Sequence, residues 1–427
     1  MKRILVACGL GVLAAGLFAA EPRPTRIAIK ATRLVDGVSD RPMSPAVVLV
    51  ENGRIAAAGP TLAIPADARV IDLGGATLLP GLIDVHDHLT SIPENSGYNA
   101  LAVSIPREAL HGAASAKRTL DAGFTSVRNV HASGYSDVAL RDAILAGEIP
   151  GPRLLVSGPA LGITGGHCDT NLLPAEYHFR ETGVADGPWE ARTRVREVIK
   201  YGADLIKICA SGGVLSKGDL PGTPQYTPEE MKAIVEEAHR LGRKVAAHAH
   251  GTQSIKEAIL AGVDSIEHAS LIDDEGVRLA KEHGVFLVMD IYNDDYILQE
   301  GLKVGMLPES IEKEKLIGRL QRENFQRAVR GGARMAFGTD AGIFPHGDNA
   351  KQFAYMVQYG MTPMQAIQAA TANAAELMGW RDRVGSIEAG RYADLIAVAG
   401  DPLVDIRALE KVGFVMKGGE IVKNTLR

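Results

Sequence analysis

The chain has 427 residues, of which 46% are hydrophobic and 23% are charged. Its formal net charge is −5 and no basic run appears, which argues against nucleic acid or an anionic membrane as a partner. A chain of this length can bury a large core, enough for a barrel of about 250 residues and a second, smaller domain.

The first twenty residues have the pattern of a secretory signal. Lys2 and Arg3 precede an apolar stretch that runs from Ile4 to Ala20 and ends in small residues. A membrane anchor is the alternative, but a clean span needs about 20 apolar residues and this stretch is shorter. We predict a signal peptide at residues 1–20, export to the periplasm or beyond, and no stable membrane insertion after cleavage.

Both ends of the mature chain are rich in short β-type runs. Residues 46–50, 51–55 and 68–72 alternate β-branched residues with Gly, Asp and Asn turns, and residues 393–398 and 412–419 have the same character. We therefore predict one small composite β-sandwich domain built from residues 25–79 and 380–427.

The middle of the chain alternates strand-like and helix-like segments. Helical patterns include residues 228–240, which Thr227 begins as an N-cap and Gly242 ends. Such an alternation over residues 80–379 predicts an α/β fold, a (β/α)₈ TIM barrel whose active site lies at the carboxyl ends of the strands. The predicted strands are residues 82–86, 126–130, 153–157, 205–209, 245–249, 265–268, 285–290 and 335–339.

Two cysteines remain after removal of the signal segment, Cys168 and Cys209. Two thiols do not make a disulfide framework, so we expect buried free thiols. Cys209 follows Lys207 by two positions and shares its side of a strand, which favours a place near the site.

Candidate metal ligands fall where predicted strands end. His86 and His88 are separated by one residue, so both imidazoles point the same way on an extended backbone. Lys207 lies in an apolar strand, where a bare ammonium is costly to bury; an inward ion pair or a side chain reaching the barrel rim would also explain it.

Further candidates follow along the chain. His248 and His250 share one face of the next predicted strand, His268 ends the one after, and Asp340 follows the last. An isolated Asp at a strand end is usually a turn or cap residue. Spacing alone does not decide which of His248 and His250 is a ligand.

The phrase before His86, residues 79–85 (Leu-Pro-Gly-Leu-Ile-Asp-Val), resembles the opening of the barrel in the amidohydrolase superfamily. Other matching segments favour the branch that contains metal carboxypeptidases, prolidase-like dipeptidases and ochratoxin amidohydrolases. These segments are residues 165–167, 211–213, 225–231, 345–349 and 393–396.

The resemblance implies a metal site with two divalent ions, zinc before manganese, cobalt or nickel. The implied ligands are His86, His88, Lys207, His248, His268 and Asp340. In such a site CO₂ carboxylates the lysine, which bridges both ions, and a bridging hydroxide attacks the amide carbonyl. Asp340 would carry the proton from this water to the leaving amine.

The resemblance also implies substrate contacts. His167 and Tyr226 would contact the scissile carbonyl or the product carboxylate, and His250 would be free to touch the substrate. His346 would serve the substrate or brace the last loop. One departure is Arg128-Asn129, where relatives often have Arg-Asp, so this chain lacks that acid. Relatives form homo-oligomers, often octamers, and we expect the same of this chain.

The function predicted from these observations is release of the C-terminal amino acid from an N-acyl amino acid or dipeptide. Ochratoxin A, an amide of phenylalanine, is a candidate substrate. The alternatives are a cyclic-amide hydrolase of the imidazolonepropionase type, which needs only one metal and no carboxylated lysine, and a barrel that binds without catalysis. The acyl group and side-chain preference depend on loop shape.

Overall fold

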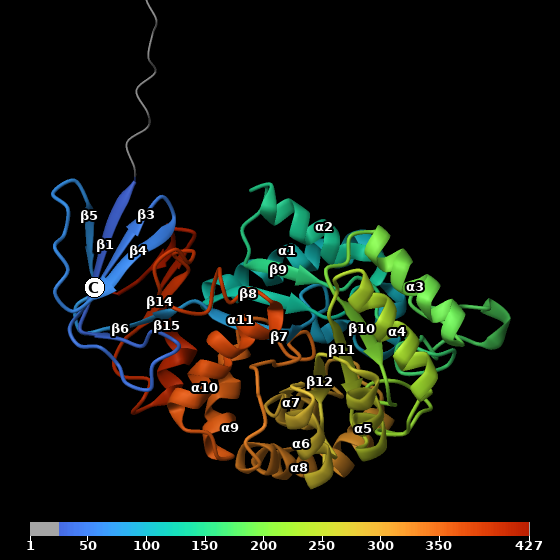
Figure 1. Cartoon of the computed structure of the whole chain (residues 1–427). Coiled ribbons are helices and arrows are strands. Elements are labelled where there is room, and N and C mark those ends of the chain that lie inside the picture. The colour runs from blue at the N-terminus through green and yellow to red at the C-terminus, as the bar shows by residue number, and fades with distance from the viewer. Residues whose placement is uncertain (1–24, 427) are drawn as a thin grey trace, which may run out of the picture.

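The structure is a computed structural model that describes residues 25–426. The predicted signal segment, residues 1–20, lies outside the described residues. The protein is an α/β protein with parallel strands and flanking helices in its middle and antiparallel strands at its two ends (Figure 1). In the described range, no helix combines the length and the apolar character that a membrane crossing requires.

Two parallel sheets occupy the middle of the chain. One has three strands in the order β7-β8-β9 and the other has four in the order β10-β11-β12-β13. Seven predicted strands are therefore present, each within two residues of its expected bounds. Their bounds are β7 Leu82–Asp87, β8 Phe124–Asn129, β9 Arg153–Val156, β10 Ile206–Cys209, β11 Val245–Ala249, β12 Ser265–His268 and β13 Phe286–Val288.

The strand predicted at residues 335–339 is not a regular strand. Met335 forms only an isolated bridge with Leu287 of β13, and the amide of Phe337 donates to Ala369 O at 3.0 Å, outside the parallel sheets. The segment still lies between strands, because Val85 N of β7 donates to Phe337 O at 2.9 Å.

Hydrogen bonds also connect the two parallel sheets on their other side. Asp204 N, just before β10, donates to Val156 O of β9 at 2.7 Å, and Leu161 bridges Ile208 in parallel. Each strand from β7 to β13 is thus linked to the next, and residues 335–339 link β13 back to β7.

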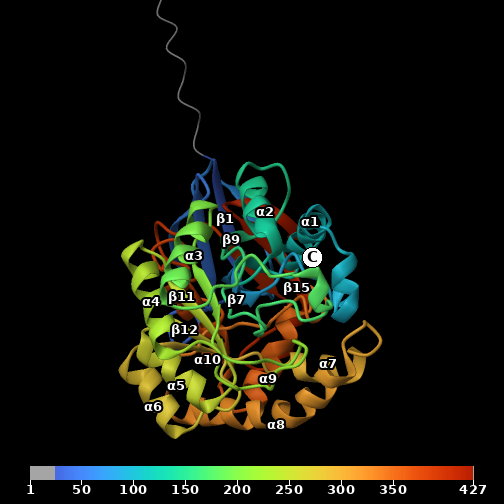
Figure 2. The same cartoon turned by 90° about the vertical axis from the view of Figure 1, so that its right-hand side faces the viewer.

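The helices lie on the outside of the parallel strands (Figure 2). Thr227 caps α4 as predicted, through a capping box in which its side chain accepts from Glu230 N. The helices are α1 Ile105–Asp121, α2 Ser136–Leu145, α3 Pro188–Lys200, α4 Pro228–Arg240, α5 Thr252–Ala261, α6 Asp274–Glu282, α7 Asn293–Glu300, α8 Pro308–Arg330, α9 Gln352–Gln358, α10 Pro363–Ala369 and α11 Ala372–Met378.

The remaining strands come from the two ends of the chain and lie side by side (Figure 1). One sheet has the order β4-β3-β1-β5 and the other β16-β15-β14-β6-β2, so the second sheet combines both ends. Buried residues of both sheets, such as Val48 and Phe414, share one hydrophobic cluster. The strands are β1 Arg26–Ala31, β2 Arg33–Leu34, β3 Ala46–Glu51, β4 Arg54–Gly59, β5 Arg69–Asp72, β6 Thr77–Pro80, β14 Leu395–Val398, β15 Val412–Lys417 and β16 Glu420–Asn424.

Candidate metal centre

All the predicted metal ligands meet at one cavity. Parallel strands carry their carboxyl ends to the same side, and the six side chains lie in or just after β7, β10, β11, β12 and the 335–339 segment. The cavity has a volume of about 210 Å³. His86, His88, Lys207, His248, His268 and Asp340 all line it.

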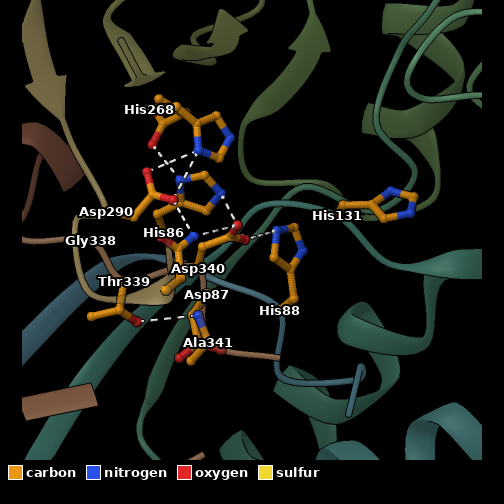
Figure 3. Close-up of polar contacts among 12 residues, drawn as sticks. His86, Asp87, His88, His131, His268, Asp290, Gly338, Thr339, Asp340 and Ala341 are labelled. Carbon is orange, nitrogen blue, oxygen red and sulfur yellow. Dashed lines mark hydrogen bonds and ion pairs between the residues drawn. The ribbon is translucent and has the colours of Figure 1, made fainter. Parts of the chain in front are cut away.

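His86, His88 and Asp340 form the first ligand group (Figure 3). Asp340 Oδ1 lies 3.4 Å from His86 Nε2 and 3.0 Å from His88 Nε2. Burial would raise the pKa of Asp340, but the two imidazoles outweigh it and hold the pKa below its usual range. Asp340 has φ of +61°, a strained conformation of the kind found at functional sites.

His248, His250 and His268 form the second group, with ring nitrogens within 4.8 Å of one another. Among the described residues, His248 Nε2 is buried without a hydrogen-bond partner. His250 Nδ1 lies 2.7 Å from Ser270 Oγ, which leaves its Nε2 free to act. The geometry therefore keeps both His248 and His250 available as ligands. His268 has φ of +68°.

The ring nitrogens of this cluster suit metal binding because most of the imidazoles are neutral. Burial lowers the pKa of His86 to about 4 and holds those of His248 and His250 well below their usual value. Burial also acts against protonation of His268, but Asp290, whose Oδ1 is 2.9 Å from His268 Nδ1, raises its pKa. The same contact directs His268 Nε2 toward the cavity.

Lys207 is 3% exposed and lies in β10. Burial lowers the pKa of its amine to about 8. Among the described residues, no carboxylate comes within ion-pair distance of Nζ, so the ion-pair explanation for this lysine has no support in the structure. A buried amine with a lowered pKa supplies the neutral nitrogen that carboxylation by CO₂ requires.

A buried ion pair that the sequence reasoning missed supports His86. Glu267 Oε2 lies 3.2 Å from His86 Nδ1, and Glu267 Oε1 lies 2.7 Å from Arg128 Nη2. Burial alone would raise the pKa of Glu267, but Arg128 and His86 lower it. Glu267 and His268 are consecutive residues of β12, so their side chains point to opposite faces of the strand. The position of Glu267 behind the metal ligands therefore follows from strand periodicity.

Asp290 was also missed as a site residue, although it ends the predicted strand at residues 285–290. It joins His86 and His268 in a third group of potential ligands, and it accepts from Asn293 Nδ2 at 2.6 Å. His131 lines the cavity too, with its ring 6.3 Å from that of His88. Burial lowers the pKa of His131 to about 3.

Some of the predicted substrate contacts line the cavity and others do not. His167 lines the cavity and stacks on His248 with ring centroids 4.1 Å apart. Tyr226 does not line the cavity: it is 1% exposed and packs in the hydrophobic core near α3 and α4. His346 also lies outside the cavity lining, where its Nε2 is 3.0 Å from Ser91 O. That contact corresponds to the bracing alternative.

The prediction of free thiols is wrong, because Cys168 and Cys209 form a disulfide. The chain after β9 runs parallel to β10, where Leu161 N donates to Lys207 O at 2.8 Å and Cys209 N donates to Leu161 O at 2.8 Å. This path brings Cys168 to Cys209 across 41 residues of sequence. The disulfide lies in the cavity wall beside His167.

Asn129, where relatives often have Asp, has a structural place here. Its Oδ1 accepts from Leu89 N at 2.7 Å, and its Nδ2 donates to His131 O at 2.9 Å and to Asp137 Oδ2 at 3.1 Å. It therefore fixes the chain after His88 and the segment that carries His131.

The donor set fits divalent metal. Clustered neutral imidazoles with a carboxylate are the ligands of zinc and related ions, and the unpartnered His248 Nε2 is an atom that a metal would satisfy. Comparison with known proteins agrees with this chemistry. The amidohydrolase family model matches residues 77–422.

The chain belongs to the amidohydrolase family. Ochratoxinase of Aspergillus niger is 37% identical over 373 residues, which cover 81% of this chain and 75% of that protein. A crystal structure of a Xaa-Pro dipeptidase with methionine bound in the active site superposes with a TM-score of 0.88 at 38% identity, over 94% of this chain and all of the other. A prolidase complexed with N-methylphosphonate-L-proline superposes with a TM-score of 0.87 at 32% identity, with the same coverage.

Proposed function

We propose that this amidohydrolase is a binuclear metal enzyme that releases the C-terminal amino acid from dipeptides or N-acyl amino acids. The observation that carries the proposal is the convergence of His86, His88, Lys207, His248, His268 and Asp340 on one cavity. The likeness to ochratoxinase and to Xaa-Pro dipeptidase supports the substrate class, and ochratoxin A is a candidate substrate.

In the proposed site, His86, His88 and Asp340 would hold one ion, and His248 and His268 would hold the other. Lys207, carboxylated by CO₂, would supply a further ligand. Two bound zinc ions would supply Lewis acidity that polarises a carbonyl and lowers the pKa of water toward about 7. The two separate groups of ligand atoms, one of His86, His88 and Asp340 and one that contains His248 and His268, support this division, and Lys207 lines the same cavity.

The protein side chains have separate tasks in the proposed reaction. Asp340 stays ionised because its imidazole neighbours lower its pKa, so it can accept a proton from the attacking water and deliver it to the departing amine nitrogen. His250 and His167 line the cavity and would orient the scissile amide. Glu267 and Asp290 position His86 and His268.

The proposal extends to the whole molecule. The linked parallel strands of residues 80–379 would form a (β/α)₈ barrel, and residues 25–79 with 380–427 a composite β-sandwich domain. We further propose export through the signal segment at residues 1–20 and assembly as a homo-oligomer, with an octamer as the first candidate. The disulfide between Cys168 and Cys209 supports an oxidising compartment.

The test is a panel of dipeptides and N-acyl amino acids, ochratoxin A included, incubated with the zinc-loaded full-length enzyme. Release of the terminal amino acid is measured by chromatography. We expect cleavage of several members. Absence of cleavage across the panel, with cleavage of a cyclic amide such as imidazolonepropionate, would favour the mononuclear alternative.

A further inference from the structure

One wall of the cavity carries two buried carboxyl groups, and each has an oxygen without a hydrogen-bond partner among the described residues. Asp294 of α7 and Glu314 of α8 both line the cavity, and they are only 2% and 3% exposed. Asp294 Oδ2 and Glu314 Oε1 are buried without a hydrogen-bond partner among the described residues.

The two carboxyl groups converge. A side-chain carbon built on Gly318 would contact Glu314 Oε1 and would lie 3.2 Å from Asp294 Oδ2. In the described part of the chain, Arg322 is the one cation within 4 Å of either group, with Nε 3.3 Å from Asp294 Oδ2. Arg322 also pairs with Asp295 at 2.9 Å, and no cation in the described part of the chain pairs with Glu314.

The other acidic residues of the cavity are satisfied. Asp169 accepts from the amides of Gly165, Thr170 and Glu181. Glu181 accepts from Thr170 Oγ1, and Asp290 accepts from Asn293 and contacts His268. Among the described residues that line the cavity, Lys207 is the only lysine or arginine.

A buried carboxylate without a partner is costly, and such groups are usually paired. Burial raises the pKa of Glu314 to about 7 and that of Asp294 well above its usual value. Without a ligand, these two carboxyl groups can therefore hold a proton. A cationic ligand would displace that proton to solvent and pair with Glu314, the carboxylate without a cation of its own among the described residues. The wall therefore has the chemistry of a site for an ammonium group.

We propose that Asp294 and Glu314 bind the free α-ammonium group of a dipeptide substrate. The proposal rests on the function proposed above and narrows it from N-acyl amino acids to dipeptides with an unblocked amino terminus.

Proximity to the reacting centre favours the α-ammonium over a basic side chain. In a dipeptide the α-nitrogen is one carbon from the scissile carbonyl, so its binding site must lie beside the metal ligands. Asn293, the neighbour of Asp294, donates to Asp340 Oδ2 at 3.4 Å, which places this wall next to the proposed proton carrier. Ile297 and Ile343, which also line the cavity, offer apolar contact to the substituents around the ammonium.

The test uses two substrates that differ only by the ammonium group, alanyl-phenylalanine and propionyl-phenylalanine. For the zinc-loaded full-length enzyme, kcat/KM is measured on both, and then on the isosteric variants Asp294→Asn and Glu314→Gln. We expect the wild type to prefer the dipeptide and each substitution to reduce that preference by about 30-fold, as the loss of a charged hydrogen bond implies. Metal content and circular dichroism verify that each variant is loaded and folded.

A matched control is Glu181→Gln, which removes a carboxylate from the same cavity and should leave the preference unchanged. A second substrate pair, alanyl-lysine and alanyl-norleucine, reports on a side-chain ammonium. Equal rates on alanyl- and propionyl-phenylalanine, an effect confined to the lysine pair, or an effect of Glu181→Gln as large as that of the other two variants would overturn the inference. If the wild type cleaves none of the four substrates, the inference about the ammonium group fails, whereas failure of the proposed function would appear as absence of cleavage across the whole panel of dipeptides and N-acyl amino acids.

Discussion

Exchange of Lys207 for methionine should stabilise the metal-free protein. Burial lowers the pKa of Lys207 from its ordinary value of 10.5 to about 8. At about 1.4 kcal/mol for each pKa unit, the charged amine costs the folded state about 3 kcal/mol at neutral pH. Methionine has a similar length and carries no charge, so the variant should gain free energy of unfolding of that order.

The pH dependence gives this prediction its sign. Between pH 8 and 10.5 the unfolded chain holds a proton on Lys207 that the folded chain has lost, so the wild-type stability should rise with pH across that window. The methionine variant should lack this rise. Urea unfolding at pH 7 and at pH 10, with a chelator present, measures both effects.

Lys244 provides the matched control. It lies just before β11, at the end opposite His248, and donates to Glu376 O and Leu377 O at 3.3 and 2.7 Å. Lys244→Met should lose about 1 to 2 kcal/mol, because two carbonyls lose their donor. If, without metal, Lys207→Met lowered the free energy of unfolding as much as Lys244→Met does, the conclusion that the buried Lys207 amine destabilises the folded state would be refuted.

Three further predictions concern the cavity and its support. Replacement of Cys168 and Cys209 by serine opens a link across 41 residues and should lower the free energy of unfolding by about 4 kcal/mol; an unchanged urea midpoint would contradict the disulfide. Gly213→Ala places a carbon within 2.9 Å of His167 Nε2 and should displace that imidazole. We therefore expect kcat/KM to fall about 10- to 100-fold with metal content unchanged. A variant with the kinetics of the wild type would exclude a role for His167. Burial raises the pKa of Asp137 to about 6, so the stabilisation by this group is present below about pH 4 and is lost as pH rises to about 6. In urea unfolding, the free energy of unfolding of Asp137→Asn should therefore fall less than that of the wild type between these pH values. An equal fall in both proteins would contradict the shift.

Much of the parallel-strand arrangement could be predicted because each strand is a short apolar run between a helix and a loop. The 335–339 segment shows the limit of this reasoning. Its composition is that of a strand, but Phe337 N bonds Ala369 O, a partner that only the folded chain brings near. The local sequence of residues 335–339 predicts that the segment is buried, but it does not determine which backbone groups the segment bonds.

Some residues of the candidate site could likewise be predicted from the sequence, and others could not. His86, His88 and Asp340 could be found because strand alternation and chain position determine where they point. Tyr226 could not be placed from a motif, since its side chain turns into the core beside α3 and α4. The disulfide had no spacing signal, and Asp294 and Glu314 look like ordinary acids of two helices. Asp290 was recognisable as a carboxylate at a strand end.

The most direct test of the metal centre is a count of divalent ions per chain in natively purified full-length protein and in its Lys207→Met variant, measured by inductively coupled plasma mass spectrometry. We predict two ions in the wild type and loss of at least one in the variant. One ion or none in the wild type, or two ions retained without Lys207, would contradict a binuclear site bridged by that lysine.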